Sequence, residues 1–379
     1  MPTAKFGIWN LPIDLILEIF FILSTKDLFC CMSVCKSWYN LITNPNFTAN
    51  YTRNLPFPTV LLACGFSSRK FFLVEIHPSG EFTQKPIKPK IPDHSETESF
   101  LSVIGFLDGL LFLLLSKRHD LHNMREQVYF CNPLFGGCFK LGDYKIVDKG
   151  NRFTQYVLGL VPSTSQFKLL RIVFEKDRRL QEAHVFTVGE DDEWRILEEP
   201  LSPLARFDTG TSFNGVYYCF DENGDCMHTF DFGTEKGGQI PGPPSSLPNR
   251  LVWKRLSVMG NSLCVIETPK NLDRIIILIL GEYRGSWSWS KKILLQNCFP
   301  GELNMGGLIP VEVLQNGDIL FTHFWKNSLV FFNRETKRCT EIKVCDSYRQ
   351  SYATVYAPRF YSIQRDVARG RYGTLEMYG

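Results

Sequence analysis

The feature that most constrains this chain is a segment plan that recurs six times between residues 55 and 365. Each copy has an apolar or aromatic strand, a polar turn and a second short strand. Periods of about 40–50 residues with four short strands each are typical of propeller blades. The residues that end the six first strands, at intervals of 56, 55, 44, 49 and 53 residues, are Ile76, Asn132, Thr187, Asp231, Leu280 and Asn333. This spacing predicts a β-propeller of six blades.

Turn residues between the apolar runs support an all-β region. Asp-Gly and Asn-Gly separate such runs at residues 108–109 and 223–224. These dipeptides favour hairpins, because Asn, Asp and Gly tolerate the positive φ that tight hairpin turns require. Gly109, Gly215 and Gly317 each open a strand and lie 106 and 102 residues apart, which is two periods.

A β-sandwich with additional hairpins is the alternative fold class. Sandwiches rarely extend over about 300 residues, whereas radial repetition protects the edges of many short sheets. We therefore expect a large all-β domain over residues 55–365, most simply a six-bladed propeller. Residues 366–379 are rich in Arg and Gly, and we expect them to form a flexible tail.

The first part of the chain has a helical period instead. Apolar residues recur at helical spacing over residues 12–23, where Pro12 suits a first turn. Ser24–Asp27 is placed as the start of a second helix, with Asp27 as in a capping box. A third apolar stripe follows over Val34–Ile42, and Asn44-Pro45 is expected to end it. Three short helices are predicted.

A helical segment of this size cannot bury all of its apolar surface by itself. From periodicity alone, it is either a cap packed on the rest of the chain or a face for a partner. The residue identities add to the period, in this order: Leu11-Pro12, Asp14-Leu15, Ile19, Leu23, Asp27-Leu28, Val34-Cys35-Lys36, Trp38, Leu41-Ile42, Pro45 and Phe47.

That order closely resembles an F-box, and residues 8–48 are identified as an F-box domain on this basis. The bulky Phe20-Phe21-Ile22 departs from the less aromatic sequence that is common in the family. The resemblance implies binding to a Skp-type adaptor, and through it to a cullin–RING ubiquitin ligase. Carried over from matching positions, the implied adaptor-binding residues are Leu11, Pro12, Leu15, Ile19, Leu28, Val34 and Trp38.

A second resemblance covers roughly residues 55–365. The runs GFLDGLLFL, YFCNP, QFKLLRIVF, DEWRIL, FNGVYYCF, SVMGNSLCVIE, GSWSW and NGDILF are similar in arrangement to the plant F-box-associated interaction domain. In that family the domain is taken to recruit the protein that is to be ubiquitinated. The pairs Gly136-Gly137 and Gly237-Gly238 resemble the double glycine of kelch repeats, but the spaced Tyr and Trp expected after it are absent.

Together the resemblances imply a substrate-recognition subunit of an SCF-type E3 ubiquitin ligase with no catalysis of its own. The alternative is an F-box-containing binding module or scaffold that captures a glycan or peptide outside the ligase. A weaker third option is a hydrolase that carries an adaptor motif. No G-x-S-x-G, Walker-type phosphate loop, H-E-x-x-H or dinucleotide fingerprint occurs in the sequence. We therefore predict no catalytic residues and no cofactor.

Net charge and the length of the apolar runs bear on which partners and which compartment are expected. Forty-two Lys and Arg against 39 Asp and Glu give a net charge of +3, too balanced to predict nucleic-acid or membrane binding. The longest uncharged apolar runs have six residues, far below the roughly 20 that span a bilayer. We expect a cytoplasmic or nuclear protein, or one present in both compartments.

The 12 cysteines are scattered, and no C-x-x-C occurs. Six residues lie between Cys131 and Cys138, and between Cys219 and Cys226, which is not a zinc-ligand spacing. We expect reduced thiols that act as small hydrophobes, and no metal site.

Target binding is expected in turns, because loops at the ends of a propeller are free to vary. Aromatic and Arg side chains are the usual anchors of interfaces. Four residues of these types fall in predicted turns or loops: Tyr283, Arg284, Trp325 and Arg206.

Overall fold

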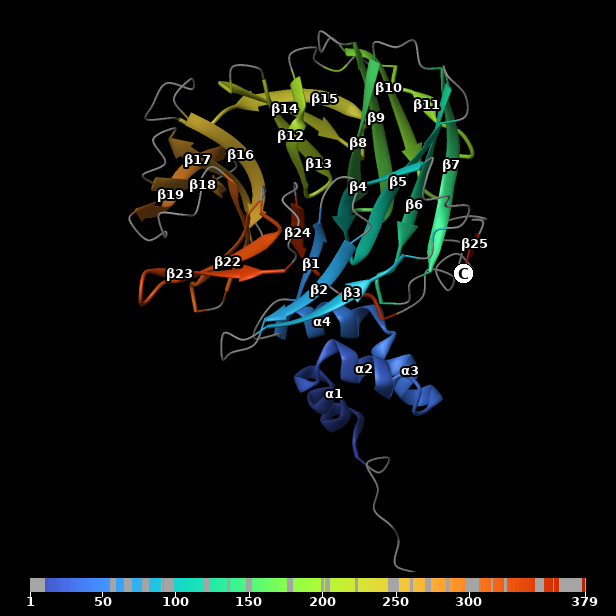
Figure 1. The fold of residues 1–379 in the computed structure, drawn as a ribbon, viewed down its shortest axis with the longest axis vertical. Helices are drawn as coiled ribbons and strands as arrows, with labels where there is room; N and C mark the ends of the chain where they lie inside the picture. The colour runs from blue at the N-terminus through green and yellow to red at the C-terminus, as the bar shows by residue number, and fades with distance from the viewer. Residues whose placement is uncertain are drawn as a thin grey trace, which may run out of the picture.

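The helices of the molecule lie together beside a ring of β-sheets (Figure 1). The computed structural model describes residues 11–54, 59–64, 70–76, 82–89, 91, 99–118, 123–134, 137–147, 152–175, 180–198, 201, 205–221, 224–244, 252–259, 262–269, 274–283, 286–296, 307–314, 316–323, 326–344, 351–356, 358–360 and 377–378. Within these residues, the helical and β regions follow one another along the chain as the sequence predicts, with the exceptions given below.

The helical module, residues 11–54, contains the three helices predicted within residues 8–48 and a fourth helix that begins at Pro45 and continues past residue 48. They are α1 (Ile13–Ile22), α2 (Thr25–Cys31), α3 (Lys36–Ile42) and α4 (Pro45–Asn54). Asn44-Pro45 does mark the end of α3, but Pro45 is itself the first residue of α4, where its missing N–H costs nothing. The Asn44 side-chain oxygen accepts the Asn46 N–H at 2.9 Å and caps the new helix.

Aromatic residues from α1, α3 and α4 form much of the core of the helical module. The rings of Phe20 and Trp38 meet edge to face with centroids 5.1 Å apart. Tyr51 of α4 donates its hydroxyl to the Leu23 carbonyl at 2.8 Å, which ties α4 to the end of α1. The predicted cap of α2 is present, because the Asp27 N–H donates to the Ser24 hydroxyl oxygen at 3.2 Å.

The strands form six antiparallel sheets, numbered here as blades with their strands in order from first to fourth. Blade 1 contains β24 (Ser351–Val355), β1 (Thr59–Cys64), β2 (Lys70–Ile76) and β3 (Phe82–Ile87). Blade 2 contains β4 (Ser99–Leu107), β5 (Leu110–Arg118), β6 (Asn123–Cys131) and β7 (Cys138–Val147). Blade 3 contains β8 (Arg152–Val161), β9 (Gln166–Glu175), β10 (Leu180–Thr187) and β11 (Arg195–Ile196).

The second half of the ring repeats the same plan. Blade 4 contains β12 (Ala205–Phe213), β13 (Val216–Asp221), β14 (Cys226–Asp231) and β15 (Lys236–Pro241). Blade 5 contains β16 (Val252–Met259), β17 (Ser262–Pro269), β18 (Arg274–Tyr283) and β19 (Ser286–Gln296). Blade 6 contains β20 (Leu308–Val313), β21 (Ile319–His323), β22 (Ser328–Asn333) and β23 (Arg338–Lys343).

The sheets close into a ring because the last long strand joins the first blade. β24 pairs with β1 in antiparallel register, with Val355 opposite Val60 and Ser351 opposite Cys64. First strands of neighbouring blades lie next to one another, as β12 does to both β8 and β16. The predicted six-bladed propeller is confirmed, and the sandwich alternative is excluded.

Six apolar clusters hold the ring together, one between each pair of neighbouring blades. Between blades 2 and 3, for example, the rings of Phe112 on β5 and Phe167 on β9 lie 5.5 Å apart. Most strands therefore bury side chains on both faces, which explains the continuous apolar runs in the sequence.

The six markers of the sequence period all lie on or directly after the third strand of a blade. Three of them have a side-chain oxygen that caps the following turn. Asn132 accepts the Leu134 N–H at 3.0 Å, and Asp231 accepts the Thr234 N–H at 2.8 Å. Asn333 accepts the Thr336 N–H at 2.8 Å. At these three markers the period is visible in the sequence because a short polar side chain caps the turn at a fixed place.

The Asp-Gly turn predicted at residues 108–109 joins β4 to β5. Asp108 has φ 49° and Gly109 has φ 72°, as a type I′ hairpin requires. Asn214 and Gly215 form the equivalent turn in blade 4, with φ 48° and 79°.

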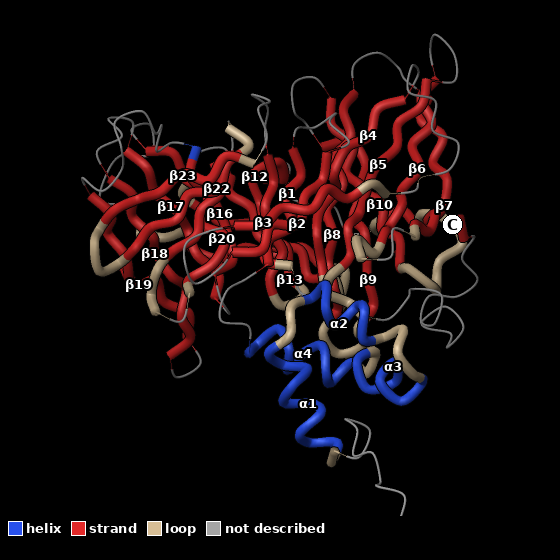
Figure 2. Tube along the Cα trace, turned by 60° about the horizontal axis from the view of Figure 1, so that its bottom comes forward, coloured by secondary structure: helices blue, strands red, loops and turns tan. Residues whose placement is uncertain are grey.

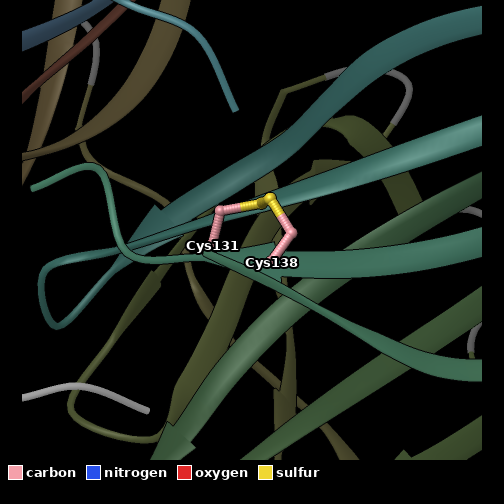
Figure 3. The surroundings of a disulfide bond; sticks show 2 residues. All are labelled: Cys131 and Cys138. Atoms are coloured by element: carbon pink, nitrogen blue, oxygen red, sulfur yellow. A yellow bond between two sulfur atoms is a disulfide. The ribbon is translucent and has the colours of Figure 1, made fainter. Parts of the chain in front are cut away.

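The expectation of reduced thiols is wrong for one pair of cysteines. Cys131 and Cys138 form a disulfide rather than two reduced thiols (Figure 3). The antiparallel register of β6 and β7 places them directly opposite each other, with Cα atoms 4.2 Å apart. Two residues of the expected flexible tail form β25 (Met377–Tyr378), which pairs with the outer edge of β7. Residues 366–376 and 379 lie outside the described part of the chain, and the flexibility of the tail stays a prediction.

Candidate functional site

The helical module exposes apolar side chains that its own core does not use. Among the described residues, six of the eight large exposed hydrophobic side chains belong to it. They are Leu11, Ile13, Leu15, Ile22, Phe29 and Val34, of which Ile22 is the most exposed at 83%. An exposed apolar patch of this kind marks an interaction site more often than it marks an ordinary surface.

Helix α1 has apolar side chains on two faces. Ile16 and Phe20 point into the core of the module and are buried. Leu15, Ile19 and Ile22 follow at steps of four and three residues, which places them on a different face of the same helix. Only one of the two apolar faces can pack on the molecule itself, so the other is available to a partner.

The structure separates the predicted adaptor-binding residues into two groups. Leu11, Pro12, Leu15 and Val34 are exposed, and Ile19 is half-buried. Leu28 and Trp38 are buried, with 0% and 9% of their surface exposed. These two are not on the exposed face, because α2 and α3 turn them against Phe20 and the rest of the module core, and their role in adaptor binding stays a prediction.

Three exposed apolar residues were missed by the sequence reasoning: Ile13, Ile22 and Phe29. Ile22 could have been found, because it continues the helical spacing of Leu15 and Ile19. Phe29 had no comparable signal, because the period within α2 is too short to define a face.

Carboxylates surround the exposed apolar side chains. Asp14 and Glu18 on α1, and Asp27 on α2, are all exposed. Asp27 also accepts the Ser24 hydroxyl at 2.7 Å. The nearby Tyr51 remains neutral, because burial raises the pKa of its hydroxyl to about 12. The module therefore offers a partner an apolar face with acidic neighbours.

The predicted target-binding residues do not come together in the described fold. Tyr283 ends β18, a third strand, at the end of the ring where Asn132 follows β6. Arg206 is near the start of β12, a first strand, and therefore lies at the opposite end. Arg284 and Trp325 are outside the described residues, next to the ends of β18 and β21. The strand ends at or next to these four residues thus lie at two opposite ends of the ring. A role in target binding stays a prediction for all four residues.

A buried polar cluster lies between blades 2 and 3. The Tyr156 hydroxyl donates to a Glu126 carboxylate oxygen at 2.5 Å, and Arg171 Nη1 is 3.4 Å from His184 Nδ1. Burial raises the pKa of Glu126 and lowers the pKa of His184, so both resist ionisation. Each of the four side chains is at most 9% exposed, so this cluster joins blades and offers no surface to a ligand.

The described residues contain no group of three or more His, Cys, Asp or Glu that could hold a metal ion. Within the same ranges, no helix is long and apolar enough to cross a membrane.

Family models and related sequences agree on what this chain is similar to. A family model described as the F-box associated beta propeller domain matches residues 60–361, and one described as the F-box domain matches residues 8–50. F-box protein At5g18160 of Arabidopsis thaliana is 25% identical over 88% of this chain and 82% of its own length. F-box protein DOR of the same plant is 27% identical over 55% of this chain and 54% of its own length.

Likeness to solved structures is weaker. A chain of the nidogen/laminin complex superposes with a TM-score of 0.42 and 11% identity, over 78% of this chain and 98% of that one.

Proposed function

Since this chain belongs to the F-box proteins that carry an F-box associated beta propeller domain, we propose that it is a substrate receptor of an SCF-type ubiquitin ligase. The helical module binds a Skp-type adaptor and, through it, a cullin–RING assembly. The propeller binds the protein to be ubiquitinated. The receptor itself carries out no chemistry in this proposal.

The observation that carries this proposal is the second apolar face of the helical module. Leu15 and Ile22 are exposed there although other apolar side chains of the module already pack in an aromatic core. A partner that covers this face would remove apolar surface from water, which stabilises the complex by roughly 25 cal/mol per Å² before the costs of association. The carboxylates beside it favour a partner surface with basic or hydrogen-bond-donor groups at its rim.

The catalytic contribution of such a receptor is proximity. Holding the target beside the ubiquitin-charged enzyme turns a bimolecular encounter into a step within one assembly. The effective local concentration then depends on how both ends of the receptor are held. We propose that this occurs in the cytoplasm, the nucleus or both.

Adaptor binding tests the proposal directly. The double variant Leu15→Ala/Ile22→Ala should weaken binding to a purified Skp-type adaptor at least tenfold, measured by calorimetry on the full chain. Both side chains are exposed, so the fold should persist, which circular dichroism would check. Ile196→Ala is a matched control, because Ile196 is 74% exposed on blade 3, away from the module. Equal affinity of the double variant and the control would contradict the proposed face.

The target can be sought with the same variants. A receptor that cannot bind the adaptor should retain its target without promoting its degradation. We therefore expect affinity capture with Leu15→Ala/Ile22→Ala to enrich proteins that are depleted in captures with the unmodified chain. Proteins captured equally by both forms would indicate a binding module that acts outside the ligase.

A further inference from the structure

After closing the ring, the chain returns to the helical module. Tyr356 directly follows β24 and is 2% exposed, and its N–H donates to the Thr59 carbonyl at 2.7 Å. Residues 358–360 come next and are all buried. We call Pro358–Phe360 the clamp segment. In Figure 1 the helical module lies next to blade 1, to which β24 belongs, and Figure 2 shows the helices grouped on one side of the strands.

Phe360 is part of the core of the helical module. Its side chain is 0% exposed, and its ring centroid lies 6.2 Å from Phe47 and 5.6 Å from Tyr51. Both of these aromatic residues belong to α4. A residue more than 300 positions away in sequence therefore completes the packing of the first four helices.

The residue before it, Arg359, is attached to the ring instead. Its guanidinium forms an ion pair with Asp108, in the turn between β4 and β5. Its carbonyl oxygen accepts the Asn132 side-chain N–H at 3.0 Å. Its guanidinium carbon also lies 5.7 Å from the ring centroid of Phe167 on blade 3. The Arg359 side chain is 8% exposed, so its charged group lies inside the molecule beside Asp108.

We propose that Arg359 and Phe360 are positioning residues, which fix the orientation of the helical module on the propeller. Arg359 contacts the ring and Phe360 contacts the core of the helices. A single peptide unit therefore joins the two parts of the molecule. Leu134, in the turn after β6, packs against the same helical core and adds a second point of support. This inference rests on the proposed function: a fixed orientation matters because the module holds the ligase and the ring holds the target.

The clamp segment follows the strand that closes the ring. β24 pairs with β1, and the clamp segment after it contacts both Asp108 and α4. A receptor whose ring is open would bind the adaptor without presenting its propeller in a defined place.

The orientation can be measured as a distance distribution. Probes attached through non-natural amino acids at Glu18 on α1 and Lys236 on β15 avoid the native cysteines, and both positions are exposed. We expect one narrow distance distribution in the unmodified full chain. Phe360→Ala should broaden its width at least twofold while the propeller remains folded. Phe82→Ala is the matched control, because Phe82 is exposed on β3 and its removal should leave the width unchanged.

If Phe360→Ala does not fold, Arg359→Gln decides the question. It removes the ion pair with Asp108 and leaves Phe360 in place, so it should broaden the distribution as well. An unchanged width in a folded clamp variant would overturn the proposal. Adaptor affinity should stay within twofold of the unmodified chain in every variant. Failure of the unmodified chain to bind the adaptor would refute the proposed function and leave the distance result intact.

A reconstituted reaction gives the functional readout. The reaction contains the adaptor, cullin, RING subunit and ubiquitin-charged conjugating enzyme. The receptor's own lysines then report which positions the ubiquitin can reach. A fixed module should restrict ubiquitin to a few lysines, and Phe360→Ala should extend it to additional positions found by mass spectrometry. An identical set of modified lysines would count against a positioning role.

Discussion

At the scale of single residues, two leucines of the helical module have opposite roles. Leu28 has 0% of its surface exposed and packs in the module core, whereas Leu15 is 44% exposed on α1. The same side chain stabilises the fold in one position and is available to a partner in the other.

Matched substitutions separate these roles. We expect Leu28→Ala to lower the free energy of unfolding of the module by about 2–5 kcal/mol, because it loses buried surface and leaves a cavity. Leu15→Ala should change it by less than about 0.5 kcal/mol. Hydrogen exchange of the amides in α1–α4 measures both on the full chain. Equal protection in the two variants would contradict the burial of Leu28.

What the sequence could predict at this scale depends on whether the cause is local. Asn132 and Asp231 were visible as markers because the side chain of each caps its own turn. The cap is a hydrogen bond between residues at most three positions apart. The burial of Trp38 was not predictable, because a helical stripe does not say which apolar face packs inward. The disulfide between Cys131 and Cys138 depends on strand register, which no spacing of cysteines reveals.

At the scale of elements, polar ties supplement the apolar layers between blades. Glu235 lies in the turn between β14 and β15. Its carboxylate accepts a hydrogen bond from the Lys168 ammonium of β9 at 2.6 Å and one from the Arg195 guanidinium of β11 at 2.9 Å. It therefore joins blade 4 to blade 3. The hydrogen bond from Arg195, with a further contribution from Lys168, holds the pKa of Glu235 below its ordinary value.

This tie predicts a specific pH dependence. A carboxylate whose pKa is lower in the folded state stabilises the fold above its unfolded-state pKa. That contribution is lost as the pH falls through the lower, folded-state pKa. Glu235→Gln should therefore cost on the order of 1 kcal/mol at pH 7, and the difference from the unmodified chain should shrink below about pH 4.5. Urea unfolding between pH 3 and 7 measures it, and a difference that stays constant across that range would contradict the assignment.

The fourth helix illustrates the limit of prediction for elements. Proline signals both the end of one helix and the first turn of the next. At Asn44-Pro45 it does both, and only the packing of Phe47 and Tyr51 in the module core shows that α4 continues the module.

At the scale of the whole molecule, the ring depends on β24. The strand comes from the end of the β region, yet it is the first strand of blade 1. Without it, Val60 and Leu62 of β1 would lose the strand that pairs with them on one side. Closure by a distant strand makes the blades one cooperative unit.

Two truncations test this dependence. Removal of residues 351–379 takes away β24 and the clamp segment, and we expect a broad thermal transition together with association in size-exclusion chromatography. Removal of residues 366–379 alone keeps both and should leave a single sharp transition. If the longer deletion unfolded as sharply as the shorter one, closure by β24 would not be required for stability.

The most direct test of the receptor role is assembly of the full chain with its proposed partners. Purified receptor, Skp-type adaptor and cullin are mixed and separated by size-exclusion chromatography with mass measurement. The proposed function predicts one species that contains one copy of each, which disappears when Leu15 and Ile22 are both changed to alanine. A folded receptor that elutes alone, with adaptor and cullin in a separate peak, would contradict it.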